Sequence, residues 1–187
     1  MISNDEQTVL VDTHNQWRTR FNSPPVVWDG DLAVVAQDWA NQIAASGQFG
    51  HRPNNQFGEN IFMGTSGAFP ANTVVDDWGS EVANWDMPSL SCAPGQVCGH
   101  FTQVVWSKTA KVGCGKATGP DGNDYWVCNY DPAGNMQGES PFGAAGAPIA
   151  PPADPAVDPV PAPDPGNFVD TPDTGNGANG EGDPLTR

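Results

Sequence analysis

The four cysteines of this chain, Cys92, Cys98, Cys114 and Cys128, all fall within one short part of its 187 residues. An even, clustered set of cysteines predicts two disulfide bonds, which form and persist in oxidising compartments. The alternative is a structural zinc site, but such sites use closely spaced pairs of the Cys-x-x-Cys kind, and this sequence has none. We therefore expect two disulfides and an extracellular location.

The start of the chain, Met-Ile-Ser-Asn-Asp-Glu, has neither the basic residues nor the apolar segment of a secretory signal peptide. Because an extracellular location requires such a signal, we expect that a signal peptide has been removed or replaced by Met1.

Charge and hydropathy exclude two classes of partner. The formal net charge is −15, which would repel the phosphate backbone of a nucleic acid. No run of about 18 apolar residues occurs, so we expect a chain that does not span a membrane.

Composition divides the chain after Phe142. Residues 143–187 contain ten prolines, seven glycines, seven acidic residues and one basic residue. Large apolar side chains are sparse there, so this segment cannot bury enough surface to offset the entropy lost on ordering it. We predict one folded domain at residues 1–142 and a disordered acidic tail, rich in proline, glycine and alanine, at residues 143–187.

Apolar residues at helical spacing predict three helices in the first half of the domain. The first runs from a capping box at Ser3 and Glu6 to Phe21, the second from Asp29 or Asp31 to Ser46, and the third from about Asn72 to Asn84. His14 lies on the apolar stripe of the first helix, so we interpret it as a hydrogen-bonded core histidine rather than a ligand.

Three segments near the end of the domain are rich in β-branched and aromatic residues, which is typical of strands. They are Phe101–Trp106, Val112–Ala117 and Tyr125–Tyr130, joined by short links that suit hairpins. Helices followed by an antiparallel meander predict an α+β domain built in layers.

Two histidines and two glutamates are the candidates for chemistry. His51 and His100 each follow a glycine, Glu59 lies between Gly58 and Asn60, and Glu81 lies near the end of the third helix. Imidazole and carboxylate groups suit a divalent metal, and they also suit acid–base catalysis. Their spacing alone does not bring them together, and each has an ordinary reading as a solvated or hydrogen-bonded residue. Neither a Gly-x-Ser-x-Gly motif nor a phosphate-binding glycine loop occurs, so we assign no catalytic residue.

Two longer motifs resemble those of a known family. They are Cys98-Gly-His-Phe-Thr-Gln-Val-Val-Trp106 and Trp126-Val-Cys-Asn-Tyr-Asp-Pro-Ala-Gly-Asn135. Both are similar to signatures of the CAP superfamily, which comprises cysteine-rich secretory proteins, insect antigen 5 and plant pathogenesis-related class 1 proteins (the SCP domain). His14-Asn15, Gly58-Glu59-Asn60-Ile61 and Trp78-Gly-Ser-Glu81 also match, so the resemblance covers about residues 6–142.

The resemblance implies a three-layer α-β-α sandwich with a central antiparallel sheet. It also implies that His51, Glu59, Glu81 and His100 face one cleft and that the two histidines bind zinc or magnesium. The family's disulfide pattern pairs Cys92 with Cys98 and Cys114 with Cys128. Plant members release a peptide after their second motif; the similar segment here is 132–142, which ends in Phe instead of Tyr.

For function, the resemblance implies a secreted, non-enzymatic, monomeric protein that binds a sterol, a fatty-acid-like molecule or another lipid in defence or host interaction. Phe62, Met63 and Phe69 are candidates to line a lipid site, with core packing as the alternative. The competing hypothesis is a metal-dependent hydrolase or protease that uses the same cleft. A third is an interaction protein in which the acidic tail acts as a spacer.

Overall fold

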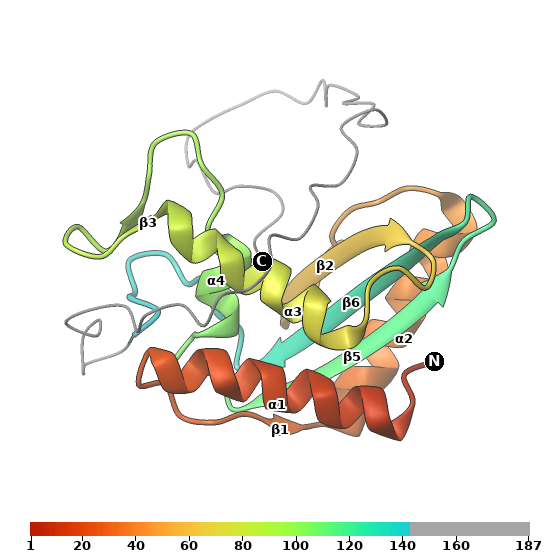
Figure 1. The fold of residues 1–187 in the computed structure, drawn as a ribbon, viewed down its shortest axis with the longest axis horizontal. Coiled ribbons are helices and arrows are strands. Elements are labelled where there is room, and N and C mark those ends of the chain that lie inside the picture. The colour runs from red at the N-terminus through yellow and green to blue at the C-terminus, as the bar shows by residue number, and fades with distance from the viewer. Residues whose placement is uncertain (143–187) are drawn as a thin grey trace.

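The computed structural model describes residues 1–142 (Figure 1). In chain order the elements are α1 (Asn4–Arg20), β1 (Val27–Trp28), α2 (Gly30–Ser46), β2 (Gly58–Thr65), α3 (Ala71–Ser80), the 3-10 helix η1 (Glu81–Asn84), β3 (Trp85–Asp86), β4 (Ser91–Cys92), α4 (Gly99–Val104), β5 (Lys111–Thr118) and β6 (Asn123–Asp131). The tail that the sequence predicts at 143–187 lies outside the described residues. Within residues 1–142, none of the helices has the length and apolar character needed to cross a bilayer.

The central sheet has the strand order β1-β5-β6-β2. β6 pairs antiparallel with β5, as the sequence predicts, and it also pairs antiparallel with β2, a strand that the sequence did not predict. β1 pairs parallel with β5. The long strands therefore form the expected antiparallel sheet, and the two-residue β1 makes the sheet mixed by adding a parallel pairing at one edge. The apolar connector at Val27–Trp28 is the added strand, because Val27 N–H donates to Ala110 O at 3.0 Å and Asp29 N–H donates to Val112 O at 2.9 Å.

Helices cover both faces of the sheet, with α1 in front of it and α2 behind it in Figure 1. Along β5, glycines face α2: a Cβ on Gly113 would lie 2.3 Å from Ala33 N, and one on Gly115 would lie 2.3 Å from Gln37 N. Their missing side chains let α2 pack directly on the strand. On the opposite face, Val112 and Cys114 are buried against the helices α1 and α3. The predicted three-layer α-β-α arrangement is thus confirmed.

The first two helices begin and end where the local sequence predicts. Ser3 Oγ accepts a hydrogen bond from Glu6 N–H, and the Glu6 carboxylate accepts one from Ser3 N–H, which completes the capping box. Asp29 caps α2 by accepting from the backbone of the next residues, and Gly47 ends α2 with a φ of 68°.

The third predicted helix is shorter than expected. α3 ends at Ser80, and the chain continues as the tighter η1. The change occurs at Glu81, whose carboxylate binds the backbone of α4 rather than solvent.

The prediction of a strand at Phe101–Trp106 is wrong, because residues 99–104 form the helix α4. The segment is buried on every side: exposure ranges from 0% at Phe101 to 6% at Thr102. Complete burial selects the same apolar, β-branched and aromatic residues in a helix as in a strand, so composition cannot distinguish the two in a short segment.

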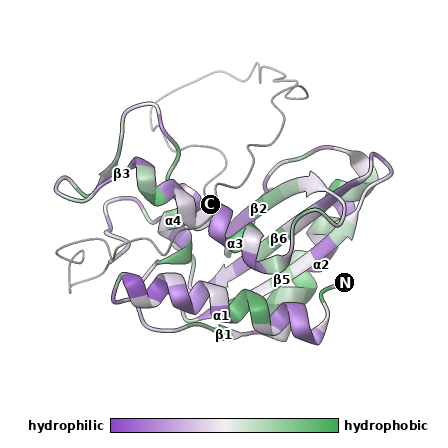
Figure 2. Cartoon of the chain, viewed as in Figure 1, coloured by the Kyte–Doolittle hydropathy of each residue, from purple (hydrophilic) through white to green (hydrophobic). Residues whose placement is uncertain are grey.

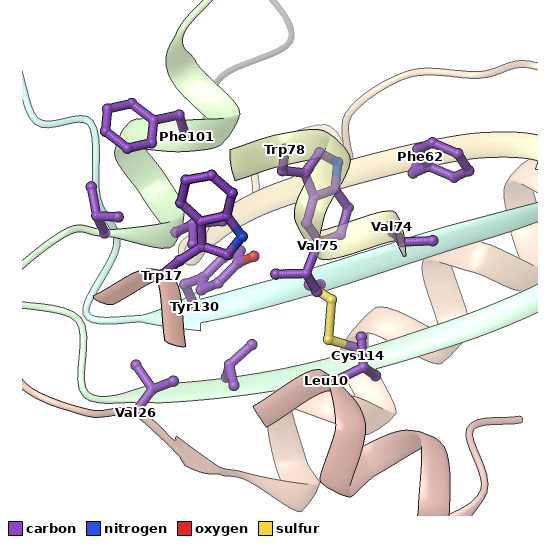
Figure 3. Packing of buried hydrophobic residues seen from close by; sticks show 14 of the residues in the cluster. Leu10, Trp17, Val26, Phe62, Val74, Val75, Trp78, Phe101, Cys114 and Tyr130 are labelled. Atoms are coloured by element: carbon purple, nitrogen blue, oxygen red, sulfur yellow. A yellow bond between two sulfur atoms is a disulfide. The ribbon is translucent and has the colours of Figure 1, made fainter. Parts of the chain in front are cut away.

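Aromatic residues dominate the larger core, between the sheet and the helices α1, α3 and α4. Figure 3 shows Trp17 and Trp78, from α1 and α3, over the strands that carry Tyr130 and Cys114. A smaller cluster joins α2 to the other face through Ile43, Ile61 and Val127. In Figure 2, α1 is largely hydrophilic with one hydrophobic part along its length. The face that it buries carries Leu10, Thr13, His14, Trp17 and Arg18, at helical spacing.

Both disulfides are present with the pairing implied by the family resemblance: Cys92–Cys98 and Cys114–Cys128. Cys114 and Cys128 lie directly opposite each other on β5 and β6 and are buried. Cys92–Cys98 closes the loop that leads into α4.

Candidate functional site

His51 and Glu59 form the first of two His–Glu pairs. His51 Nδ1 lies 2.7 Å from Glu59 Oε1. The carboxylate also accepts from Arg52 N–H at 2.9 Å, from Asn55 Nδ2 at 3.1 Å and from Asn129 Nδ2 at 3.4 Å. Glu59 is only 1% exposed, and these four donors compensate for its burial. The arrangement fixes the orientation of the His51 ring.

His100 and Glu81 form the second pair. His100 Nδ1 lies 2.6 Å from Glu81 Oε1, and Glu81 Oε2 accepts from the backbone N–H groups of His100 at 2.9 Å and Phe101 at 3.1 Å. α4 has no capping side chain of its own, so Glu81 caps this helix from η1. The Trp78 ring stacks on His100, with centroids 6.4 Å apart and planes 18° apart.

The second ring nitrogen of His51 and of His100 has no hydrogen-bond partner within residues 1–142. Because a carboxylate accepts at each Nδ1, the Nδ1 atoms of His51 and His100 donate, and in the neutral ring Nε2 then carries the lone pair. Both Nε2 atoms are buried and make no hydrogen bond within the described residues. A carboxylate on the far nitrogen is the arrangement that orients histidines in metal sites.

Two consecutive residues of the edge strand β2, Glu59 and Asn60, contact the two pairs. Glu59 pairs in register with Asn129 and shares its face of the sheet. The next residue, Asn60, points to the other face, where its Nδ2 donates to His100 O at 3.1 Å. The structure therefore places all four predicted residues around the start of β2, as two separate pairs. A shared cleft stays a prediction.

His14 is a core histidine, as predicted. It is fully buried, its Nδ1 donates to Leu10 O at 2.7 Å, and its Nε2 accepts from Tyr130 Oη at 2.8 Å. Burial lowers the pKa of His14, the Leu10 hydrogen bond raises it and the nearby Arg18 charge lowers it; the net result is a pKa of about 4.

Asp77 is a further carboxylate near the second pair, and the sequence did not single it out. It lies four residues before Glu81, and its charge interacts with both His100 and Glu81. Burial raises the pKa of the Asp77 carboxyl above its ordinary value, Glu81 raises it further, and His100 opposes the shift. The spacing of Asp77 and Glu81, one helical turn apart, was the available signal.

Two of the candidate lipid-lining residues belong to the core. Phe62 is 9% exposed and packs edge-on against Phe69, with ring centroids 5.1 Å apart. Both rings contact the larger core, which supports the alternative of core packing.

The kind of ion that this site could bind depends on which side-chain atoms can act as metal ligands. In the described part of the chain, His, Cys, Asp and Glu form no group of three or more placed to hold a metal. The metal ligands predicted from the sequence, His51 and His100, would offer only their two Nε2 atoms. Imidazole nitrogen suits zinc better than magnesium, which prefers oxygen.

Comparison with known proteins gives consistent matches. The family model described as "CAP: Cysteine-rich secretory protein family" matches residues 11–130. Pathogenesis-related protein 1A of Nicotiana tabacum is 41% identical over 139 residues, covering 74% of this chain and 82% of the tobacco protein. The structure of BmVAL-1 has a TM-score of 0.62 and 29% identity over 72% of this chain and 80% of that one. The crystal structure of NaASP2 with Zn2+ has a TM-score of 0.60 and 26% identity over 75% of this chain and 86% of that one.

Proposed function

The chain belongs to the cysteine-rich secretory protein (CAP) family, and we propose that it is a secreted, non-enzymatic, defence-type protein that binds a divalent metal ion, zinc in preference to magnesium, through His51 and His100. One observation carries the metal proposal: two buried Nε2 atoms have no partner among the described residues, while a carboxylate orients each ring through Nδ1. The NaASP2 structure with Zn2+ supports it by family likeness. The two disulfides fit an extracellular location.

A bound ion would supply positive charge and open coordination positions at this site. The chain's own residues orient the two imidazoles through the Nδ1–carboxylate contacts. Two protein ligands leave the remaining positions to water or to a small-molecule ligand.

The hydrogen bonds of the two glutamates argue against either of them as the base of a hydrolase. A metal-dependent hydrolase needs a carboxylate free to accept a proton from water. Both oxygens of Glu81 are occupied by His100 and the α4 backbone, and both oxygens of Glu59 by four donors. All four cysteines are in disulfides, so no thiol nucleophile is available. We therefore favour binding over catalysis.

Zinc titration by calorimetry tests the metal proposal. We expect the wild type to bind zinc, and His51→Gln or His100→Gln to weaken binding at least about tenfold. Asp12→Asn, on the exposed face of α1, is the control and should bind as the wild type does. Equal zinc binding by the wild type and the double histidine variant would contradict the proposal.

We also propose that the ligand is a sterol or another small lipid, on the strength of family membership alone. Saturable binding of a labelled sterol to the oxidised protein is the expected result. Its absence, together with absence of fatty-acid binding, would remove the lipid proposal and leave the metal proposal standing.

A further inference from the structure

Asn60 is completely buried on β2, between the two His–Glu pairs. Its Nδ2 donates to the carbonyl oxygen of His100 at 3.1 Å and to Tyr130 Oη at 3.3 Å. Its Oδ1 is buried and has no hydrogen-bond partner in the described residues.

The contacts fix which way the Asn60 amide faces. The carbonyl oxygen of His100 can only accept, so Nδ2 must lie beside it and Oδ1 must point elsewhere. Tyr130 Oη then accepts from Asn60 and donates to His14 Nε2 at 2.8 Å. The side chains therefore form a chain of donors: Asn60 on β2 donates to Tyr130 on β6, and Tyr130 donates to His14 on α1.

Two consecutive residues of β2 hold the two pairs. Glu59 binds the His51 ring from one face of the strand, and Asn60 binds the backbone of His100 from the other. A strand fixes the distance between neighbouring residues, so this dipeptide sets where one histidine lies relative to the other.

Stability alone does not explain why an asparagine side chain is buried at position 60. A buried carbonyl oxygen without a donor costs about 1–3 kcal/mol, and an apolar residue of similar size would avoid that cost. The asparagine is useful here for its donor, which reaches the helix that carries His100.

We propose that Asn60 is a positioning residue, which holds α4 against β2 and thereby sets the placement of the His100 imidazole relative to His51. This inference rests on the proposed metal site, since the spacing of the two imidazoles matters when one ion must contact both. It concerns the chain's own hydrogen bonds and predicts an effect in the metal-free protein as well.

The test compares Asn60→Leu with Tyr130→Phe. The first removes the donor to His100 in a neutral side chain of similar size. The second breaks the link to α1 but leaves the Asn60–His100 bond, so it controls for general loss of core hydrogen bonding. Should Asn60→Leu fail to fold, Asn60→Ala removes the same donor without bulk.

Two measurements are needed. One is the NMR chemical shifts of the His100 imidazole nitrogens in zinc-free protein, and the other is the dissociation constant for zinc. We expect Asn60→Leu to change the His100 shifts and weaken zinc binding at least about tenfold, and Tyr130→Phe to leave zinc binding within about twofold. Unchanged His100 shifts in Asn60→Leu, or equal losses in the two variants, would overturn the proposal. If the wild type binds no zinc, the metal function fails, and the zinc-free His100 shifts still decide the role of Asn60.

Discussion

Arg18 and Glu81 bind opposite ends of the same short helix. The Glu81 carboxylate accepts from the N-terminal amides of α4, and the Arg18 guanidinium donates to Val104 O and Trp106 O, both at 2.9 Å, at its C-terminal end. A negative group at the N-terminus and a positive group at the C-terminus both complement the helix dipole. α4 has six residues, too few for a stable isolated helix, so these two side chains and its burial stabilise it.

Arg18→Lys should destabilise the fold strongly. Arg18 is fully buried and also donates to Pro24 O and Thr109 O, so one planar guanidinium serves four carbonyl groups. A lysine ammonium cannot reach all four, and each carbonyl left unpaired costs about 1–3 kcal/mol. We expect a loss of roughly 2–4 kcal/mol in urea denaturation. Arg20→Lys changes a half-buried arginine of the same helix, whose guanidinium lies over the Trp17 ring and can be replaced there by an ammonium. It should cost less than about 1 kcal/mol; equal losses would contradict this role of Arg18.

Stability should fall in mild acid because of His14. The pKa of His14 is about 4 in the folded protein and 6.5 in the unfolded chain, so the unfolded state takes up the proton first. The contribution of neutral His14 to the free energy of unfolding is complete above pH 6.5 and is lost as the pH falls toward 4. It amounts to about 3 kcal/mol at about 1.4 kcal/mol per pH unit. Free energies of unfolding measured from pH 7 to pH 4 test whether stability decreases as expected. A His14 proton resonance that titrates near pH 6.5 in the folded protein would contradict the role given to His14.

The two disulfides should differ in access to reductant. Cys114 and Cys128 are 2% and 0% exposed, whereas Cys92 is partly exposed in a surface loop. Exchange needs direct attack of a thiolate on sulfur, so Cys92–Cys98 should be reduced at lower dithiothreitol concentration. Alkylation followed by peptide mapping measures the order. Labelling of Cys114 and Cys128 first would be inconsistent with the burial described above.

Asp77→Asn should weaken zinc binding modestly. The carboxylate interacts electrostatically with His100, so its negative charge favours a cation at that imidazole. We expect a two- to fivefold increase in the dissociation constant, roughly the effect of one partly screened charge pair. Asp12→Asn removes the same charge from the exposed face of α1 and should leave binding unchanged. If both variants bind zinc as the wild type does, Asp77 has no role at the site.

The parts of the fold that were predicted correctly depend on local chemistry. Capping residues such as Ser3 and Asp29 act on backbone groups within their own turn, so the start of each helix is visible in the sequence. α4 depends instead on Glu81 and Arg18, which are distant in sequence, and its composition predicted a strand. β1 was missed for the same reason, because two residues gain a strand assignment only from pairing with β5.

The candidate site was also predictable only in part from the sequence. His51, Glu59, Glu81 and His100 were identified individually, but only the family resemblance grouped them, because spacing carries no information on long-range contacts. The pairing of each Nδ1 with a carboxylate, and the buried unpartnered Nε2 atoms, required the structure. Asn60 was noted only as a neighbour of Glu59, and its contact with the His100 backbone has no local signal.

The most direct test of the metal site is a long-range proton–nitrogen correlation spectrum of the three histidines, recorded with and without zinc. The site predicts protonated Nδ1 atoms at His51 and His100, and a zinc-induced shift at both of their Nε2 atoms. His14, whose nitrogens are both hydrogen-bonded in the core, should not change and serves as the internal control. Spectra in which zinc leaves the Nε2 atoms of His51 and His100 unshifted would contradict the proposed function.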